Sequence, residues 1–386
     1  MWATDIKAGA SGITPLNNSS VAAIEALFSL AEKKPKQQKG GTGTKRKATS
    51  LLDQKRSTNV AIVLSKFKIP HRALKMAIWR LDDTVLDEDD VVGLLTAVPT
   101  QEEIGVLQNA LDGGAVLSEL GKSEQYFGEV RAIPRLAARL ENWLYMLSFE
   151  EKRKDTAQQL DDILGAIDSV TQSKSFRRVL AFLLATGNFL NAGSFRAGAI
   201  GVKISVLTLI QETKQSGSNR TLIHHLARAK PQECAAIVTE FASVRRARMA
   251  DFASLVTTAN QLADGLAKLT AEATATQSAQ YSEMARELAG ALDQVDALPP
   301  RLESFAQEAG AKIASMQAQI GRCGEQLLVL CRFFELPSPK VIQDCAPTAS
   351  EIFGILDNMA KALVESLAAN AREDEAASKK PTPRRS

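Results

Sequence analysis

Aromatic residues and the two residues that most often interrupt regular structure are scarce in this sequence. Aromatics make up 5% of the 386 residues, and the 23 glycines and 13 prolines together make up about 9%, against ~12% in an average protein. The chain is rich instead in alanine, leucine, glutamate, lysine, arginine and glutamine, all good helix formers. No segment alternates convincingly between apolar and polar residues, as a half-buried strand does. The composition therefore predicts an all-α protein, and its long helical segments predict an elongated one.

Side chains that bind metals or act as nucleophiles are also few. The four cysteines include no CxxC pair, which predicts reduced thiols, and we expect them to pack in the core. Two of the three histidines, His224 and His225, are adjacent, so on a helix they point about 100° apart and cannot share one metal ion. We expect one of them to be buried and the other exposed. The sequence thus predicts no metal, no cofactor and no enzymatic activity.

Long apolar runs and a strong net charge are absent as well. No run approaches the ~20 residues that span a bilayer, and the N-terminus does not resemble a secretory leader. The formal net charge of +3 is too small by itself to demand a nucleic-acid or membrane partner. These absences predict a soluble, cytoplasmic protein that binds neither membranes nor nucleic acids.

Apolar spacing predicts helices from residue 51 onward. Four residues repeat at i, i+3, i+4 and i+7 and so share one helix face: Leu74, Ala77, Ile78 and Leu81. Capping boxes at Thr100–Glu103 and Ser148–Glu151 predict two helix starts. Further along, a seam alternates steps of three and four residues, as in a coiled coil: Phe252, Leu255, Ala259, Leu262, Leu266 and Leu269. Two more helices are expected at about 300–335 and 349–370.

A basic segment separates a short N-terminal helical piece from the rest of the chain. Residues 31–50 carry seven lysines and arginines between Lys33 and Lys47 and have no apolar periodicity, which predicts a flexible linker. Its GGTGTKRKATS run is not a phosphate-binding loop, because no glycine directly precedes Lys45 and no strand leads into it. A localisation signal or a phosphate-binding patch is the alternative interpretation.

The most unusual stretch is residues 187–214, where glycines gather in an otherwise glycine-poor chain: Gly187, Gly193, Gly198 and Gly201. This density predicts a long ordered loop with tight backbone approaches between two helices. Asn188 and Asn191 flank Phe189 and Leu190, a combination that favours a pocket for a side chain from elsewhere. An irregular helix–helix connection is the alternative.

The same stretch carries a family resemblance. GNFLNAGSFRAGAIGVKIS (187–205) resembles the signature of the formin homology 2 family, and TLIHHL (221–226) resembles the motif that follows it. LLDQKRSTNVAIVLSKFKIP (51–70) is similar to an earlier motif of the family, and PTQEEI and RFFELP occur in the family order. The resemblance runs over about residues 1–350.

The resemblance implies a head-to-tail ring dimer of all-helical chains, in which the N-terminal lasso of each chain encircles the post of the other. It places the lasso at 1–30, a flexible linker at 31–50, the knob at 51–130, the coiled-coil and post regions at 131–350, and a C-terminal helix with a basic, disordered tail at 351–386. These boundaries agree with the linker that composition alone predicts.

Residues that hold such a dimer together are implied as well. Trp2 would be the aromatic anchor of the lasso. Its pocket on the other chain would form around Gly187, Asn188, Phe189, Leu190 and Asn191. Many relatives have a second lasso tryptophan that this chain lacks, so we expect a weaker dimer.

The implied partner is actin, whose filaments the dimer would nucleate and processively cap or elongate at the barbed end. Ile62 carries over as the knob contact, with Asn59 and Arg56 alongside, although a packed core position is the alternative for Ile62. Lys203 carries over as the lasso–post contact, with Arg196 as a secondary one. The family usually has phenylalanine before that lysine, where this chain has valine. Profilin–actin would be recruited only through a proline-rich segment that this chain does not contain, and the protein would be cytoskeletal.

Two other functions fit parts of the sequence. A coiled-coil scaffold that dimerises through residues 235–295 without binding actin would explain the helices but not the 187–214 loop. A nucleic-acid binder would use the 33–47 run and the basic tail, and its binding would depend strongly on salt.

Overall fold

In the computed structural model, the described residues are 51–193, 198–334, 336 and 345–378. Within these ranges every named element is a helix, and the only strand-like pairing is an isolated bridge between Lys214 and Thr221. The all-α prediction is therefore confirmed. The chain divides after Lys47 into two units, and all of the described residues belong to the second. The predicted lasso and linker, with Trp2, lie outside the described residues, as does Arg196.

The first group of helices encloses one apolar core. It comprises α2 (Gln54–Leu64), α3 (His71–Arg80), α4 (Glu88–Thr96), α5 (Gln101–Asp112), the 3-10 helix η1 (Leu117–Glu119) and α6 (Lys122–Val130). The predicted stripe of α3 is buried here, beside Trp79 and Phe127. The Thr100–Glu103 capping box starts α5 as predicted, with both reciprocal bonds formed. Local signals therefore define these helices, and burial of their apolar faces packs them together.

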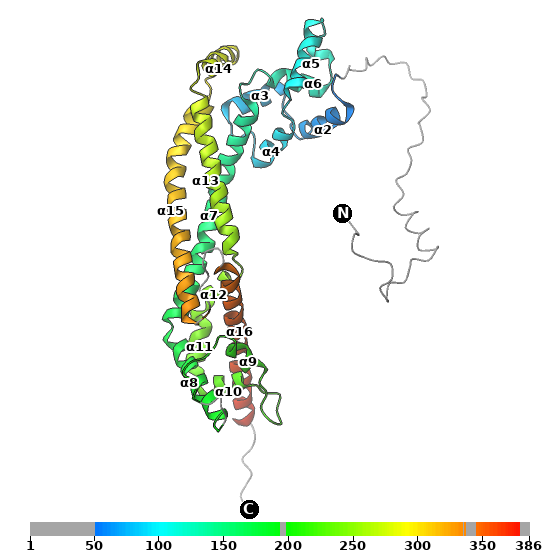
Figure 1. The fold of residues 1–386 in the computed structure, drawn as a ribbon. Coiled ribbons are helices and arrows are strands. Elements are labelled where there is room, and N and C mark those ends of the chain that lie inside the picture. The colour runs from blue at the N-terminus through cyan, green and yellow to red at the C-terminus, as the bar shows by residue number, and fades with distance from the viewer. Residues whose placement is uncertain (1–50, 194–197, 335, 337–344, 379–386) are drawn as a thin grey trace, which may run out of the picture. The chain divides into compact units, whose positions relative to one another are not determined.

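The long helix α7 (Leu136–Gln172) connects this core to a second one (Figure 1). Its 37 residues correspond to a length of about 55 Å. Its first part buries Leu140 and Trp143 in the first core, and its last part buries Ile163 and Ile167 in the second. The helix start predicted at Ser148 is wrong, because Ser148 is a buried residue in the middle of α7. Because α7 buries apolar residues before Ser148 in the first core and after it in the second, the helix continues past this local start signal.

The predicted coiled-coil seam packs inside the chain. Helix α13 (Phe252–Ala275) lies against α7 and against α15 (Leu298–Phe333), and α14 (Ala279–Leu292) connects α13 to α15. Gly265 brings α13 close to α7, since a Cβ there would lie 2.4 Å from the Tyr145 ring. The Tyr145 hydroxyl donates a hydrogen bond to the Leu262 carbonyl at 2.7 Å. Because neighbouring helices of the same chain bury this seam, a scaffold that dimerises through it is not supported.

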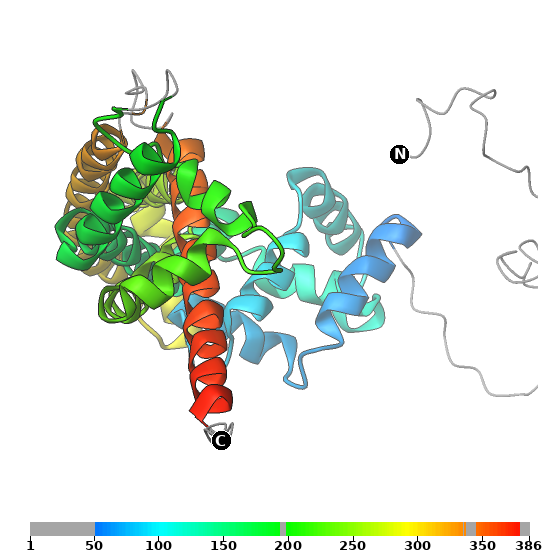
Figure 2. The ribbon, with the colours of Figure 1, turned by 90° about the horizontal axis from the view of Figure 1, so that it is seen from below.

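The second core collects the remaining helices. They are α8 (Lys174–Leu190), α9 (Val206–Glu212), α10 (Leu222–Ala229), α11 (Pro231–Glu240), α12 (Ala242–Ala247) and α16 (Cys345–Ser378). Figure 2 shows α16, in orange to red, lying along the green helices of this group. The sequence placed α16 at 349–370, but it begins earlier and ends later. Buried Asp357 fixes it to α12 through Arg248 at 2.8 Å and Arg245 at 3.4 Å.

A buried arginine of α7 connects α3 to the segment around α14. Arg139 of α7 is fully buried, with its guanidinium 4.6 Å from the centre of the Trp79 ring. It donates hydrogen bonds to the Trp79 carbonyl at 3.1 Å, to the Tyr281 hydroxyl at 3.0 Å and to Asp296 Oδ1 at 2.8 Å. The Trp79 indole N–H in turn donates to the Gln294 carbonyl at 3.1 Å. These bonds fix α3 to the long helices, and they hold the first group of helices in place on α7.

Candidate functional site

Helix α2 presents an exposed isoleucine. Ile62 is 61% exposed, while Val60 and Leu64 on the opposite face are 1% and 7% exposed. Ile62 is therefore not a core residue, which removes that alternative. Asn59 lies on the same exposed face, about one turn before Ile62. The predicted pair of Ile62 and Asn59 is thus available on the surface of a single helix.

Two lysines that sequence reasoning missed also belong to this surface. Lys55 precedes Ile62 by seven residues, which is two helical turns, and it is exposed. Lys66 follows Ile62 by four residues, just past the end of α2, and it is exposed too. The seven- and four-residue spacings were visible in the sequence and could have identified both. The exposed face therefore carries the apolar Ile62 and the polar Asn59 between two cations.

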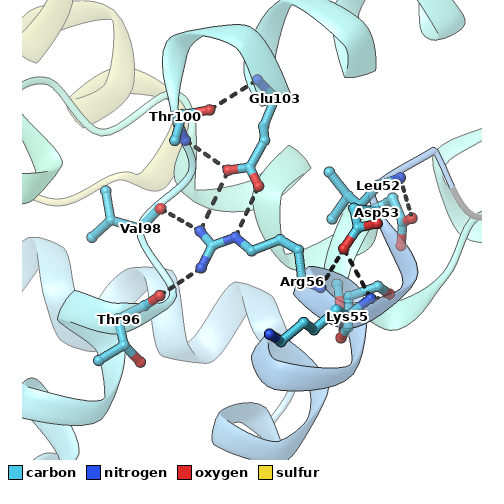
Figure 3. A network of polar contacts seen from close by, with 11 residues as sticks. Leu52, Asp53, Lys55, Arg56, Thr96, Val98, Thr100 and Glu103 are labelled. Carbon is cyan, nitrogen blue, oxygen red and sulfur yellow. Dashed lines mark hydrogen bonds and ion pairs between the residues drawn. The ribbon is translucent and has the colours of Figure 1, made fainter.

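Arg56 has a different environment, which Figure 3 shows. Its Nε lies 2.8 Å from Glu103 Oε1, and its Nη1 and Nη2 donate to the carbonyls of Thr96 and Val98 at 2.7 and 2.8 Å. The guanidinium also lies 5.7 Å from the centre of the Phe127 ring. The guanidinium N–H groups of Arg56 are therefore already bonded to residues of the same chain, and these bonds fix α2 to the connection between α4 and α5.

Glu103 has two partners. It forms the ion pair with Arg56, and it accepts a hydrogen bond from the Thr100 backbone N–H at 2.8 Å as part of the α5 capping box. Burial opposes ionisation of this carboxyl, but the hydrogen bonds from Arg56 and Thr100 outweigh burial and lower the pKa of Glu103 below its usual value. Glu103 is therefore ionised at neutral pH, and it holds both Arg56 and the start of α5.

The glycine-rich segment begins at the end of α8. The Asn188 side chain donates to the Ala199 carbonyl at 3.0 Å and accepts from the Ala199 N–H at 2.8 Å, so it links the end of α8 to residue 199. Gly193 and Gly198 have φ angles of +83° and +81°, which side-chain-bearing residues rarely adopt. The predicted tight backbone approaches are wrong at all four glycines, since a Cβ at each would meet no atom within 4 Å. Glycine is needed at two of them for backbone conformation.

Apolar side chains at this end of α8 face solvent in the single chain. Phe189 is 79% exposed and Leu190 is 64% exposed, and Ile200 across the Asn188 link is 99% exposed. Of the other residues predicted for this pocket, Gly187 lies in the last turn of α8, and Asn191 is the C-cap of that helix. Single exposed apolar residues are ordinary, but three that gather around one loop are typical of a surface that a partner covers.

Lys203 lies just beyond this apolar surface. It is exposed, and Ile204 beside it is only 8% exposed and anchors the segment in the second core. Val202, which stands where phenylalanine was expected, is half-buried. Lys203 is thus exposed next to a residue of the second core, Ile204. Ile62 is exposed on a helix whose buried residues belong to the first core.

The described residues offer little for covalent or metal chemistry. Among them, no group of three histidine, cysteine, aspartate or glutamate residues could hold a metal ion. Cys234, Cys323 and Cys331 are free and buried, and burial raises the pKa of the Cys234 thiol to about 11 and that of Cys323 to about 12. His224 is half-buried in a capping box with Thr221, and His225 is exposed. No helix in the described part is both long enough and apolar enough to cross a membrane.

Comparisons with known proteins agree on one family. The model of the Formin Homology 2 Domain matches residues 10–363. The chain is 28% identical to Formin-like protein 20 of Arabidopsis thaliana over 315 residues, which is 80% of this chain and 18% of that protein. It is 27% identical to Formin-like protein 21b of the same plant over 292 residues, covering 75% of this chain and 68% of that protein. The chain thus spans about a fifth of the first of these relatives and about two thirds of the second.

The motifs, the all-helical fold and the exposed residues at 62 and 203 are consistent with this match. Because the family model covers nearly the whole of the chain, the chain belongs to the formin homology 2 family.

Proposed function

We propose that this domain binds actin and, as a homodimer, nucleates filaments and processively caps or elongates their barbed ends. The observation that carries the proposal is the exposed Ile62, held on a helix whose position Arg56 fixes. Full burial of an isoleucine contributes about 1.5–3 kcal/mol, so covering its exposed 61% on a partner contributes about 1–2 kcal/mol. A residue that contributes more than about 1 kcal/mol belongs to the minority that carry most of the binding energy of an interface.

The two surfaces would act together. Ile62 and its neighbours would form the knob contact, and Lys203 would form the post contact, with Arg196 beside it as the sequence predicts. A ring of two chains holds four such surfaces, enough to keep two or three actin subunits close together and so lower the barrier to nucleation. The work is binding and not covalent chemistry, so any ATP hydrolysis would be performed by actin.

The dimer would form through the apolar surface at the end of α8. Phe189, Leu190 and Ile200 would be covered by the lasso of the other chain, with Trp2 as its anchor. The 31–50 linker would set the effective concentration at which one half of the ring rebinds while the other half stays attached. Profilin–actin delivery would require a proline-rich segment outside this chain.

Actin assembly followed by fluorescence tests the proposal. Wild-type protein should shorten the lag or change barbed-end elongation, and Ile62→Ala should need about tenfold more protein for the same effect. Val106→Ala is the matched control, because Val106 is 47% exposed on α5, away from α2. If wild type has no effect on actin, or if both variants behave alike, the proposal is wrong.

A further inference from the structure

A hollow of about 920 Å³ lies beside α2 in the first group of helices. It is bounded by the end of α2, the start of α3, the residues around η1 and the start of α6. Its apolar lining includes Leu64, Phe67, Ile69 and Val116, and Val116 is 54% exposed. The volume falls within the range of sites that take a drug-sized molecule or a bulky side chain. None of the contacts described above uses this hollow.

The rim of the hollow has uncompensated positive charge. Arg72 and Lys122 are both exposed at its edge, and neither is ion-paired within the described ranges. The one carboxylate on the rim, Glu129, lies 3.5 Å from the Lys75 ammonium, so its charge is offset. Burial, assisted by Lys122 and opposed by Glu129, lowers the pKa of His71, which keeps this ring neutral at neutral pH. The rim therefore favours an anion.

Helix α2 lines the hollow and also carries the proposed actin contact. Ala61 and Ser65 lie in the lining on either side of Ile62 in the sequence. Ser65 follows Ile62 by three residues and is its neighbour on the helix surface, so a partner that covers Ile62 reaches the edge of the hollow.

The chain's own basic segments have the wrong charge for this rim. The 31–50 segment carries seven lysines and arginines between Lys33 and Lys47, and the last eight residues contain four more and no acidic residue. Either segment would bring like charge to Arg72 and Lys122, which is unfavourable. An acidic partner segment is complementary instead.

We propose that the hollow is a second actin contact, which takes a bulky apolar side chain flanked by a carboxylate from the same actin subunit that covers Ile62. The apolar side chain fills the space above Leu64 and Phe67, and the carboxylate pairs with Arg72 and Lys122. This inference rests on the proposed function, because it takes the partner at Ile62 to be actin.

Val116→Glu and the double variant Arg72→Glu/Lys122→Glu test the inference, since all three side chains are exposed; circular dichroism checks that each variant is folded. Val116→Glu should weaken actin binding about tenfold, because it puts a carboxylate where an apolar side chain binds. The double variant should slow association several-fold at low salt, with a smaller difference at high salt. Val106→Glu and Arg80→Glu are the matched controls, as both residues are exposed and outside the hollow.

The outcomes separate this inference from the proposed function. If Ile62→Ala weakens actin binding while the hollow variants match their controls, the hollow is not an actin contact and the proposed function stands. If neither Ile62→Ala nor the hollow variants change actin binding, the proposed function has failed. If a hollow variant changes the mass of the dimer in solution, a second copy of the chain occupies the hollow and the inference is overturned.

Discussion

Arg56→Lys distinguishes a positioning role of Arg56 from a direct contact with actin. The sequence placed Arg56 beside Ile62 as a basic contact, but its guanidinium is engaged by Glu103 and by the carbonyls of Thr96 and Val98. Lysine keeps the positive charge and loses the planar fork. If Arg56 contacts actin through its charge, lysine should therefore substitute for it. If Arg56 positions α2, as we propose, lysine should fail.

The size of the effect follows from the contacts that are lost. A hydrogen bond with a charged partner contributes about 1.5–3 kcal/mol, and partial exposure reduces this value. The side chains of Arg56 and Glu103 are 28% and 17% exposed, and lysine retains at most one of the three partners. We therefore expect local opening of α2 to become easier by about 2 kcal/mol, which corresponds to about thirtyfold faster exchange of its protected amides.

Hydrogen exchange of α2 peptides, run beside the actin assembly assay, is the measurement. Both Arg56→Lys and Arg56→Ala should accelerate exchange in α2 and reduce actin assembly, although Ile62 is unchanged. Exchange in α13, which packs against α7 and α15, should stay the same and serves as the internal control. A lysine variant that matches wild type in both assays, while alanine fails, would refute the positioning role.

Three further predictions concern packing, pH and the dimer. Gly265→Ala should destabilise the protein by about 1–2 kcal/mol in chemical denaturation, because the new methyl group meets the Tyr145 ring at 2.4 Å; Gly310→Ala, where nothing lies within 4 Å, should be neutral or slightly stabilising. Burial raises the pKa of Asp357, but hydrogen bonds from Lys361 and Arg248 outweigh burial, so its pKa is lowered on folding. The stability that Asp357 contributes is present above its unfolded pKa of about 3.9 and is lost as pH falls through the lower folded value. Asp357→Asn should therefore remove part of the acid sensitivity of circular dichroism below about pH 4, and equal slopes would contradict this. Trp2→Ala and Phe189→Ser should each shift the mass in light scattering toward the monomer, and an unchanged dimer would contradict the lasso assignment.

Local patterns in the sequence predicted the helices well where the signal and the packing agree. The α3 stripe is buried as spaced, and the Thr100–Glu103 box starts α5. The same type of signal failed at Ser148, because a capping box reports only on its own four residues. Whether a helix stops there depends on the cores that α7 buries on either side, and these come from segments far along the chain.

The candidate site shows the same division. Two sequence motifs identified Ile62 and Lys203, and both residues are exposed in the structure. Each motif is contiguous in the sequence, so it could be recognised without knowing the fold. The environment of Arg56 was not predictable, because its partner Glu103 is 47 residues away. The hollow beside α2 was also not predictable, since two stretches more than 40 residues apart in the sequence, 61–72 and 116–129, line it. Sequence reasoning identified residues and missed their non-local partners.

The joint at Arg139 bears on how the proposed ring could move. Arg139 is a fully buried charge with hydrogen bonds to Trp79, Tyr281 and Asp296, and removing one partner of a buried charge costs about 3–5 kcal/mol. Of these partners only Trp79 belongs to the first group of helices. Rotation of that group on α7 would have to break the Arg139–Trp79 bond together with the bond from the Trp79 indole to the Gln294 carbonyl, which disfavours rotation at every step of a repeated cycle. Under the proposed function, stepping must therefore come from release at one actin contact and from the 31–50 segment that joins the halves. The knob would keep its orientation on α7 throughout the cycle.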